Sequence, residues 1–243
     1  MLTAIPVAGK AKSRDICDAF IAGAPRTAKG FVTYGVNDTN HAEFLAAQAA
    51  SLPIWQIDNS YFDKARGLFF RVTKNRLQHT GLGETDGKRF ARLGIEVKPF
   101  VHFSHGPVIV VEQSDSFMRI HAGEAPRPTN RPTRGAGSGA WLHAQMAEHT
   151  LGRKVKFRAW HNDKIKQGLG LAVDLQGASL LITHSSAAAV EALRNGVPVV
   201  VSPLSCCYGH RPADRERLFG VLADNQFTLN EMKDGTAWAA LNK

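Results

Sequence analysis

Residues Ala178–Pro203 have the sequence ASLLITHSSAAAVEALRNGVPVVVSP, and this segment is the most informative about the fold. The apolar run Leu180–Ile182 predicts a short buried strand, and the alanine-rich segment Ala187–Arg194 predicts a helix that stops at Asn195-Gly196. The β-branched run Val197–Val201 predicts a second buried strand directly afterwards. Strand, short helix and strand in this order form a βαβ crossover, which indicates an α/β protein with a parallel sheet.

The turn between the first strand and the helix is made of small and polar residues, Thr183, His184, Ser185 and Ser186. It lies at the carboxyl end of the predicted sheet, where ligands of such proteins bind. Free backbone N–H groups and the helix dipole favour an anion there. We expect Ser185 and Ser186 to cap the helix and to offer hydroxyls to a phosphate. The simpler alternative is a Rossmann-like crossover with a capping serine and a solvated Glu191.

Together with Glu191, Gly196 and Pro198, this turn resembles the nucleotide-sugar-binding segment of the GT-B glycosyltransferases. The resemblance is greatest to the branch of capsular-polysaccharide and CDP-glycerol glycerophosphotransferase-like enzymes. It implies that His184–Ser186 hold the donor diphosphate. It also implies that Glu191, five residues before Gly196, holds the donor ribose.

Two upstream segments extend the resemblance. The strand-like run Lys154–Trp160 stands where such transferases often carry an arginine strand, which makes Arg158 a candidate donor-binding residue. The histidine–proline pair that ends that strand in the family is absent, because His161 is not followed by proline. The run Pro107–Val111 predicts the opening strand of the same half, and Ser114 in the loop after it is another donor-binding candidate.

Strands and helices also alternate in the N-terminal half, which predicts a second parallel sheet. The expected strands are Thr3–Ala8, Gly30–Val36, Pro53–Asp58 and Leu68–Val72, and the expected helices are Ser13–Ile21, with Ser13 as its cap, and Thr39–Ser51. We therefore expect two small Rossmann-like lobes facing across a cleft, a compact GT-B-like arrangement. The predicted division gives an acceptor-side lobe, residues 1–104, and a nucleotide-sugar-binding lobe, residues 105–243.

Sugar transfer requires stabilisation of the leaving diphosphate and, for an inverting reaction, a general base. We expect a metal-independent reaction without a cofactor, because no Asp-x-Asp signature is present and the serine turn can hold the diphosphate. Asp58 and Asp38 are the predicted bases, since each follows a predicted strand. A turn residue is an equal alternative for Asp38, and His41 and His105 are weaker candidates.

Thirty Lys and Arg against 21 Asp and Glu give a net charge of +9, which favours a polyanionic partner. The positive residues gather in two segments: Arg66, Arg71, Lys74, Arg76, Lys88, Arg89 and Arg92, and Arg127, Arg131 and Arg134 of the loop Gly123–Gly139. The end of the chain, Leu222–Leu241, resembles the closing segments of phage and prophage proteins. We therefore predict a hydroxymethylated base of phage DNA as acceptor, reached by base flipping.

Other classes of function remain open. One is a transferase of cell-surface polysaccharide or glycerol phosphate, and another is a non-enzymatic nucleic-acid-binding protein. A serine hydrolase is disfavoured, because His184–Ala187 lacks the glycines of a nucleophile elbow. No apolar run approaches the roughly 20 residues of a membrane span. The three cysteines suit buried thiols in a reducing cytoplasm, the predicted location.

Overall fold

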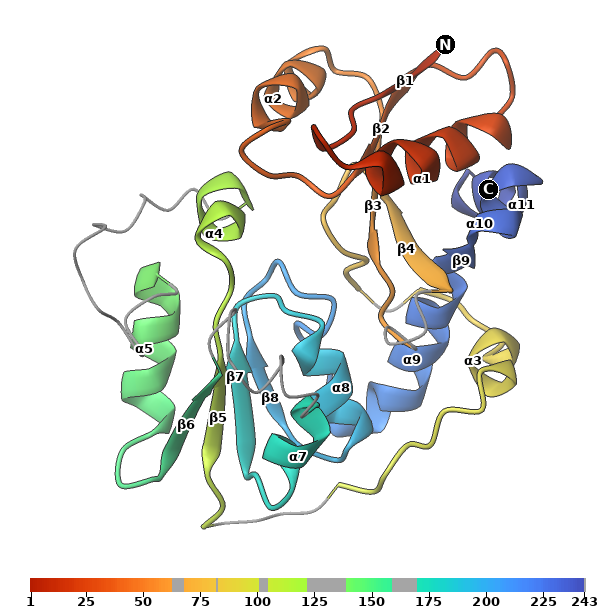
Figure 1. Cartoon of the computed structure of the whole chain (residues 1–243). Coiled ribbons are helices and arrows are strands. Elements are labelled where there is room, and N and C mark those ends of the chain that lie inside the picture. Colours follow the sequence, from red (N-terminus) through yellow and green to blue (C-terminus); the bar gives the residue numbers. More distant parts are fainter. Residues whose placement is uncertain (63–67, 82, 101–104, 122–138, 159–169, 243) are drawn as a thin grey trace. The chain divides into compact units, whose positions relative to one another are not determined.

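The computed structural model of the chain describes residues 1–62, 68–81, 83–100, 105–121, 139–158 and 170–242 (Figure 1). Helices and strands alternate along it, which confirms the predicted Rossmann-like α/β class. By their contacts the residues divide into a first unit, residues 1–79 with 220–243, and a second unit, residues 80–219. The sequence predicted a single boundary between residues 104 and 105. That division into two lobes stays a prediction.

A five-stranded sheet forms the first unit. Its strand order is β1 (Leu2–Ala4), β2 (Gly30–Tyr34), β3 (Ile54–Asn59), β4 (Phe69–Lys74) and β9 (Gln226–Thr228). The first three strands are parallel, whereas β4 runs antiparallel to both β3 and β9. The expectation of a purely parallel sheet is therefore wrong for β4. Residues 60–68 join it to β3, and this connection is shorter than the roughly dozen residues of a parallel crossover.

The C-terminal segment completes the core of this N-terminal sheet. Its helices α10 (Leu229–Lys233) and α11 (Thr236–Leu241) belong to the unit that contains α1 (Ala11–Ala22) and α2 (His41–Ala49). One buried cluster joins side chains of α1, the sheet and the C-terminal segment, among them Phe20, Trp55, Phe227 and Met232. Residues from both ends of the chain therefore stabilise the same sheet.

Ser13 does not cap α1, because the helix begins two residues earlier, after Lys10. The Ser13 side chain is fully buried; its hydroxyl accepts from the backbone N–H of Val7 at 2.9 Å and donates to the carbonyl of Tyr34 at 3.2 Å. It thus ties the helix to the segment after β1 and to the last residue of β2. The predicted cap is wrong because the partners of this hydroxyl are distant in the sequence.

The second unit contains a parallel four-stranded sheet. Its order is β6 (Val155–Arg158), β5 (Val108–Val111), β7 (Leu180–Thr183) and β8 (Val199–Val201). The chain starts in β5, moves to β6 on one side, and then returns to β7 and β8 on the other. The connections after β5 and β7 therefore leave the sheet in opposite directions, and the carboxyl ends of these two strands form a topological switch point.

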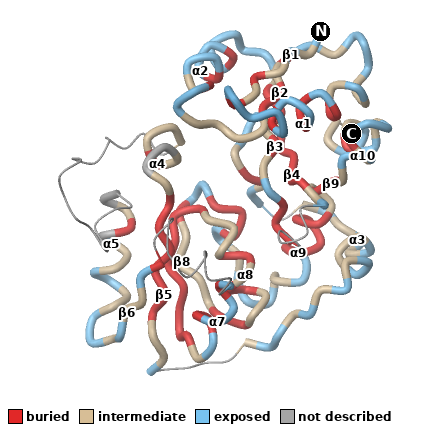
Figure 2. The backbone as a smooth tube through the Cα atoms, viewed as in Figure 1, coloured by how far each residue is buried: buried red, intermediate tan, exposed pale blue. Residues whose placement is uncertain are grey.

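Helices cover both faces of this sheet, as opposite crossover directions require. Side chains alternate along the strands: Val108, Val110, Leu180 and Ile182 pack with α5 (Gly139–His149), and Ile109, Val111 and Leu181 pack with α7 (Leu171–Leu175) and α8 (Ala188–Arg194). Figure 2 shows β5 as a buried strand in the middle of the layer. The strands are thus covered on both faces, and their ends remain for binding.

The remaining elements of the described chain are α3 (Lys88–Arg92), α4 (Asp115–His121), the 3₁₀-helix η2 (Pro212–Asp214) and α9 (Arg215–Asp224). One of the two boundaries between the units lies within α9. Cys17, Cys206 and Cys207 are free and buried, as predicted. Among the described residues, no helix has the length and apolar character needed to cross a membrane.

Candidate active site at the ends of β5 and β7

Two polar loops meet at the switch point of the second unit. Residues Glu112–Ser114 follow β5, and residues His184–Ser186 follow β7 (Figure 1). The buried hydroxyl of Thr183 donates to the carbonyl of Val111 at 2.8 Å and so joins the two strand ends. The loop that contains Ser114 therefore follows a strand joined directly to the strand before the His184–Ser186 turn, and the donor-binding role of these residues stays a prediction.

Gln113 holds the two loops together and was missed by sequence reasoning. When the side-chain amide of Gln113 is oriented with its oxygen facing the turn, this oxygen accepts hydrogen bonds from the backbone N–H of Ser186 at 2.6 Å and of Ser185 at 3.2 Å. A neutral side chain thus occupies two of the N–H groups expected to face the donor phosphate. Its position directly after a predicted strand was the signal that could have identified it.

The two serines of the turn have different environments. Ser186 is partly exposed, and its hydroxyl accepts from the N–H of Ala188, the first residue of α8, at 3.2 Å. The N-cap of α8 is Ala187, so neither Ser185 nor Ser186 occupies the predicted capping position. Ser185 is buried, and its Oγ lies 3.2 Å from Nδ1 of His184. Of the two hydroxyls, that of Ser186 is therefore the more accessible to a ligand.

His184 is a buried imidazole at the centre of this turn. Its Nδ1 also lies 3.2 Å from the hydroxyl of Ser202, and its ring stands nearly perpendicular to that of Trp141 with centroids 5.4 Å apart. Burial lowers the pKa of His184 below its usual 6.5. The histidine is thus neutral at neutral pH and contributes hydrogen bonds rather than charge to the site.

Burial of neutral His184 predicts that the protein loses stability in mild acid. In the unfolded chain a histidine titrates near 6.5, so the unfolded state binds more protons than the native state below that pH. The folding stability that depends on a neutral His184 is therefore complete above pH 6.5, and it is lost progressively as the pH falls below that value. We expect the melting temperature to fall between about pH 7.5 and 5.5, and to fall less in His184→Gln.

The control for this pH series is His41→Gln, in α2, which should retain the wild-type slope. Burial also lowers the pKa of His210, so the wild-type slope contains more than one histidine, and the difference between variants is the measured quantity. Equal slopes in wild type and His184→Gln would contradict the burial of a neutral imidazole.

Arg158, a predicted donor-binding residue, forms a buried ion pair. Its Nη1 lies 2.5 Å from Oδ2 of Asp174 in α7, and each side chain is 10% exposed. The pair joins the end of β6 to the helix that precedes β7. This ion pair alone accounts for a buried arginine at this position. The role of Arg158 in donor binding stays a prediction.

Ser114 directly precedes α4, and Glu191 lies in the first turn of α8. The hydroxyl of Ser114 accepts from the N–H of Phe117 at 3.1 Å and so starts α4. Glu191 lies in α8 and is partly exposed; within the described part of the chain its carboxylate has no hydrogen bond or ion pair. Its acid group is therefore available to a ligand, as the ribose-binding prediction requires.

The predicted bases Asp58 and Asp38 belong to the first unit. Asp58 is the next-to-last residue of β3, where its Oδ2 lies 2.5 Å from Nη2 of the buried Arg71 and its Oδ1 accepts from the N–H of Asn59 at 2.7 Å. Asp38 is exposed in the turn after β2, which agrees with a turn residue. Arg66, His161 and the predicted loop up to residue 138 lie outside the described residues.

No protein-family profile matches the chain, and no curated protein sequence matches it. Among solved structures, the chain is similar to Thermosulfurimonas dismutans KpsC, a beta Kdo 2,4 transferase. The two share 13% sequence identity and a TM-score of 0.50, over 91% of this chain and 89% of that one. At this identity the likeness is one of fold, and it extends over both units.

Proposed function

We propose that the chain is a glycosyltransferase that moves a sugar from a nucleotide-sugar donor to a saccharide acceptor. The observation that carries the proposal is the set of polar groups at the switch point, where residues Glu112–Ser114 and His184–Ser186 meet. Nucleotide ligands of open α/β sheets bind at this position. The likeness in fold to a beta Kdo 2,4 transferase supports a sugar as the transferred group.

In this proposal the donor lies across the turn after β7. Glu191 accepts hydrogen bonds from the ribose hydroxyls, since its carboxylate has no partner in the described chain. Ser186 donates its hydroxyl to the diphosphate, and the amide of Gln113 rotates away to give the phosphate the N–H groups of Ser185 and Ser186. Donors placed in this way stabilise the negative charge that grows on the leaving group as the glycosidic bond breaks.

The acceptor would be activated by Asp58 or Asp38. Both carboxylate oxygens of Asp58 have donors in the protein, Arg71 and Asn59, which fix its orientation. Asp38 is exposed in the turn after β2. A general base must reach the acceptor hydroxyl within hydrogen-bond distance, so these two acids are the first to substitute once turnover is measured.

A hydroxymethylated base of phage DNA is the second candidate acceptor, favoured by the net charge of +9. The fold likeness favours a saccharide instead, and one of the gathered arginines, Arg71, is buried against Asp58. The resemblance of Leu222–Leu241 to phage proteins has no support in the comparisons. An assay that offers both acceptors with the identified donor decides between them.

The test is a thermal-shift and calorimetry panel of nucleoside mono- and diphosphates and their sugars. We expect one base to raise the melting temperature and Glu191→Gln to weaken its binding about 10- to 100-fold, because hydrogen bonds to a charged group contribute about 1.5–3 kcal/mol. The matched control is Glu43→Gln, an exposed glutamate of α2, which should bind normally. No binding of any nucleotide, or equal loss in both variants, would remove the transferase proposal.

A further inference from the structure

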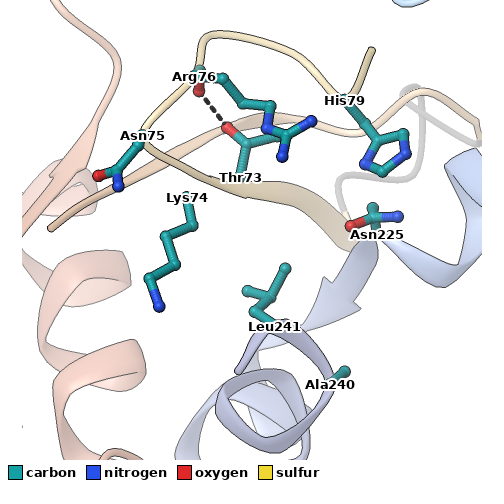
Figure 3. A pocket seen from close by; sticks show the side chains of 8 residues that line it. All are labelled: Thr73, Lys74, Asn75, Arg76, His79, Asn225, Ala240 and Leu241. Carbon is teal, nitrogen blue, oxygen red and sulfur yellow. Dashed lines mark hydrogen bonds between the residues drawn. The ribbon is translucent and has the colours of Figure 1, made fainter. Parts of the chain in front are cut away.

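A cavity of about 580 Å³ lies in the first unit, at the end of β4 (Figure 3). That volume is within the range of small-molecule sites. Its walls come from three separate parts of the chain: β4 and the turn after it, residue Asn225, and helix α11. The polar residues that line it are Thr73, Lys74, Asn75, Arg76, His79 and Asn225.

This cavity is distinct from the predicted acceptor side of the same sheet. Lys74 pairs with Trp55 near the start of β3, whereas Arg71 pairs with Asp58 near its end. Three residues of strand separate the two positions on β4, which is about 10 Å. The cavity thus lies toward the amino ends of the parallel strands, away from the edge that presents Asp58.

The cavity has an excess of positive charge. Lys74 and Arg76 line it together with the imidazole of His79, and the eight lining residues include no acid. The ammonium of Lys74 has neutral partners: Oδ1 of Asn242 at 2.6 Å and the ring of Trp55, 5.4 Å from its centroid. Within the described chain Lys74 has no acidic partner, so its charge is available to a ligand.

The turn that carries these groups is held in place before any ligand binds. The hydroxyl of Thr73 donates to the carbonyl of Arg76 at 2.5 Å, and the N–H of His79 donates to the hydroxyl of Tyr61 at 3.0 Å. Asn75 adopts a left-handed φ of 57°, and its Oδ1 accepts from the N–H of Ile54 at 2.8 Å. The amide NH₂ of Asn75 therefore remains as a donor at the cavity wall.

We infer that this cavity binds a small ligand with an oxyanion group, a phosphate or a carboxylate. Cations and amide donors on a fixed turn match the oxygens of such a group. Nothing in this inference depends on the proposed transferase activity, because the cavity and the switch point lie in different units.

The test is a titration of the full chain with pyrophosphate and, separately, with galacturonate, followed by calorimetry and tryptophan fluorescence. The indole of Trp55 lies under the Lys74 ammonium, so occupancy should change the emission. We expect saturable binding of at least one probe, weakened about tenfold or more in Lys74→Met and in Arg76→Gln. The preferred probe tells a phosphate ligand from a carboxylate ligand.

Two controls keep this test decisive. Lys29→Met removes one exposed charge from the same unit and should bind normally. Melting curves check that each variant is folded. No saturable binding of either probe, equal weakening in Lys29→Met, or binding of duplex DNA without binding of the small anions would overturn the inference.

Discussion

Gly196→Ala should destabilise the protein by about 3 kcal/mol or more, and lower its melting temperature by roughly 10 °C. Gly196 has a φ of 77°, and an added Cβ would lie 2.0 Å from the carbonyl oxygen of Pro99. The segment at Pro99 is held there by a hydrogen bond from the N–H of Lys98 to the carbonyl of Arg194, 2.9 Å long. Both partners of this contact are fixed by the backbone, so no flexible side chain can move aside to make room for the added methyl group. Urea unfolding of both proteins measures the difference.

Gly177→Ala is the matched control for this prediction. Gly177 has a similar φ of 69°, but an added Cβ would meet nothing within 4 Å. Gly177→Ala should therefore cost only the free energy of placing an alanine in the left-handed region, about 1–2 kcal/mol. Equal losses for the two variants would contradict the close approach of Pro99. Gly196, one of the residues that carry the sequence resemblance, thus has a packing role in this fold.

Asp174→Ala should cost about 3–5 kcal/mol of folding free energy, because it leaves the guanidinium of Arg158 buried without its carboxylate. The exposed pair of Lys88 and Asp86, with side chains 73% and 59% exposed, supplies the comparison. Asp86→Ala should cost clearly less than Asp174→Ala, because water screens an exposed pair. Urea unfolding of both variants measures the two costs, and equal costs would show that the Arg158 pair is not buried in solution.

The double variant Arg158→Met, Asp174→Leu tests the role of Arg158 itself. Apolar residues of similar size should restore most of the lost stability. If Arg158 only supports the fold, this variant binds nucleotides like the wild type. If Arg158 also contacts the donor, binding is weakened in a protein that remains stable.

Local patterns predicted much of the fold. Ala178–Pro203 forms the expected strand, helix and strand, because its apolar runs and alanine-rich segment have strong preferences of their own. The strand direction of Phe69–Lys74 was missed, since an apolar run is the same in either direction. The return of Gln226–Thr228 to the N-terminal sheet was missed as well, because an edge strand carries no sign of its partner.

The candidate site was predictable where polar residues directly follow a predicted strand. The loop after β5 meets the His184–Ser186 turn through Gln113, because neighbouring parallel strands end at one edge of the sheet. The partner of Arg158 was not predictable, because the local sequence around a basic residue at a strand end does not show whether the residue contacts a ligand or Asp174. The cavity at Lys74 has walls from three distant segments, so only the folded chain shows it.

The central claim is that a nucleotide binds at the carboxyl ends of β5 and β7. Hydrogen–deuterium exchange of the full chain, with each nucleotide of the panel at saturating concentration, tests it most directly. We predict that one nucleotide slows exchange in residues 112–118 and 183–191, and that Glu191→Gln reduces this protection. Exchange that stays unchanged in both segments with every nucleotide, or protection confined to residues 73–79, would contradict the claim.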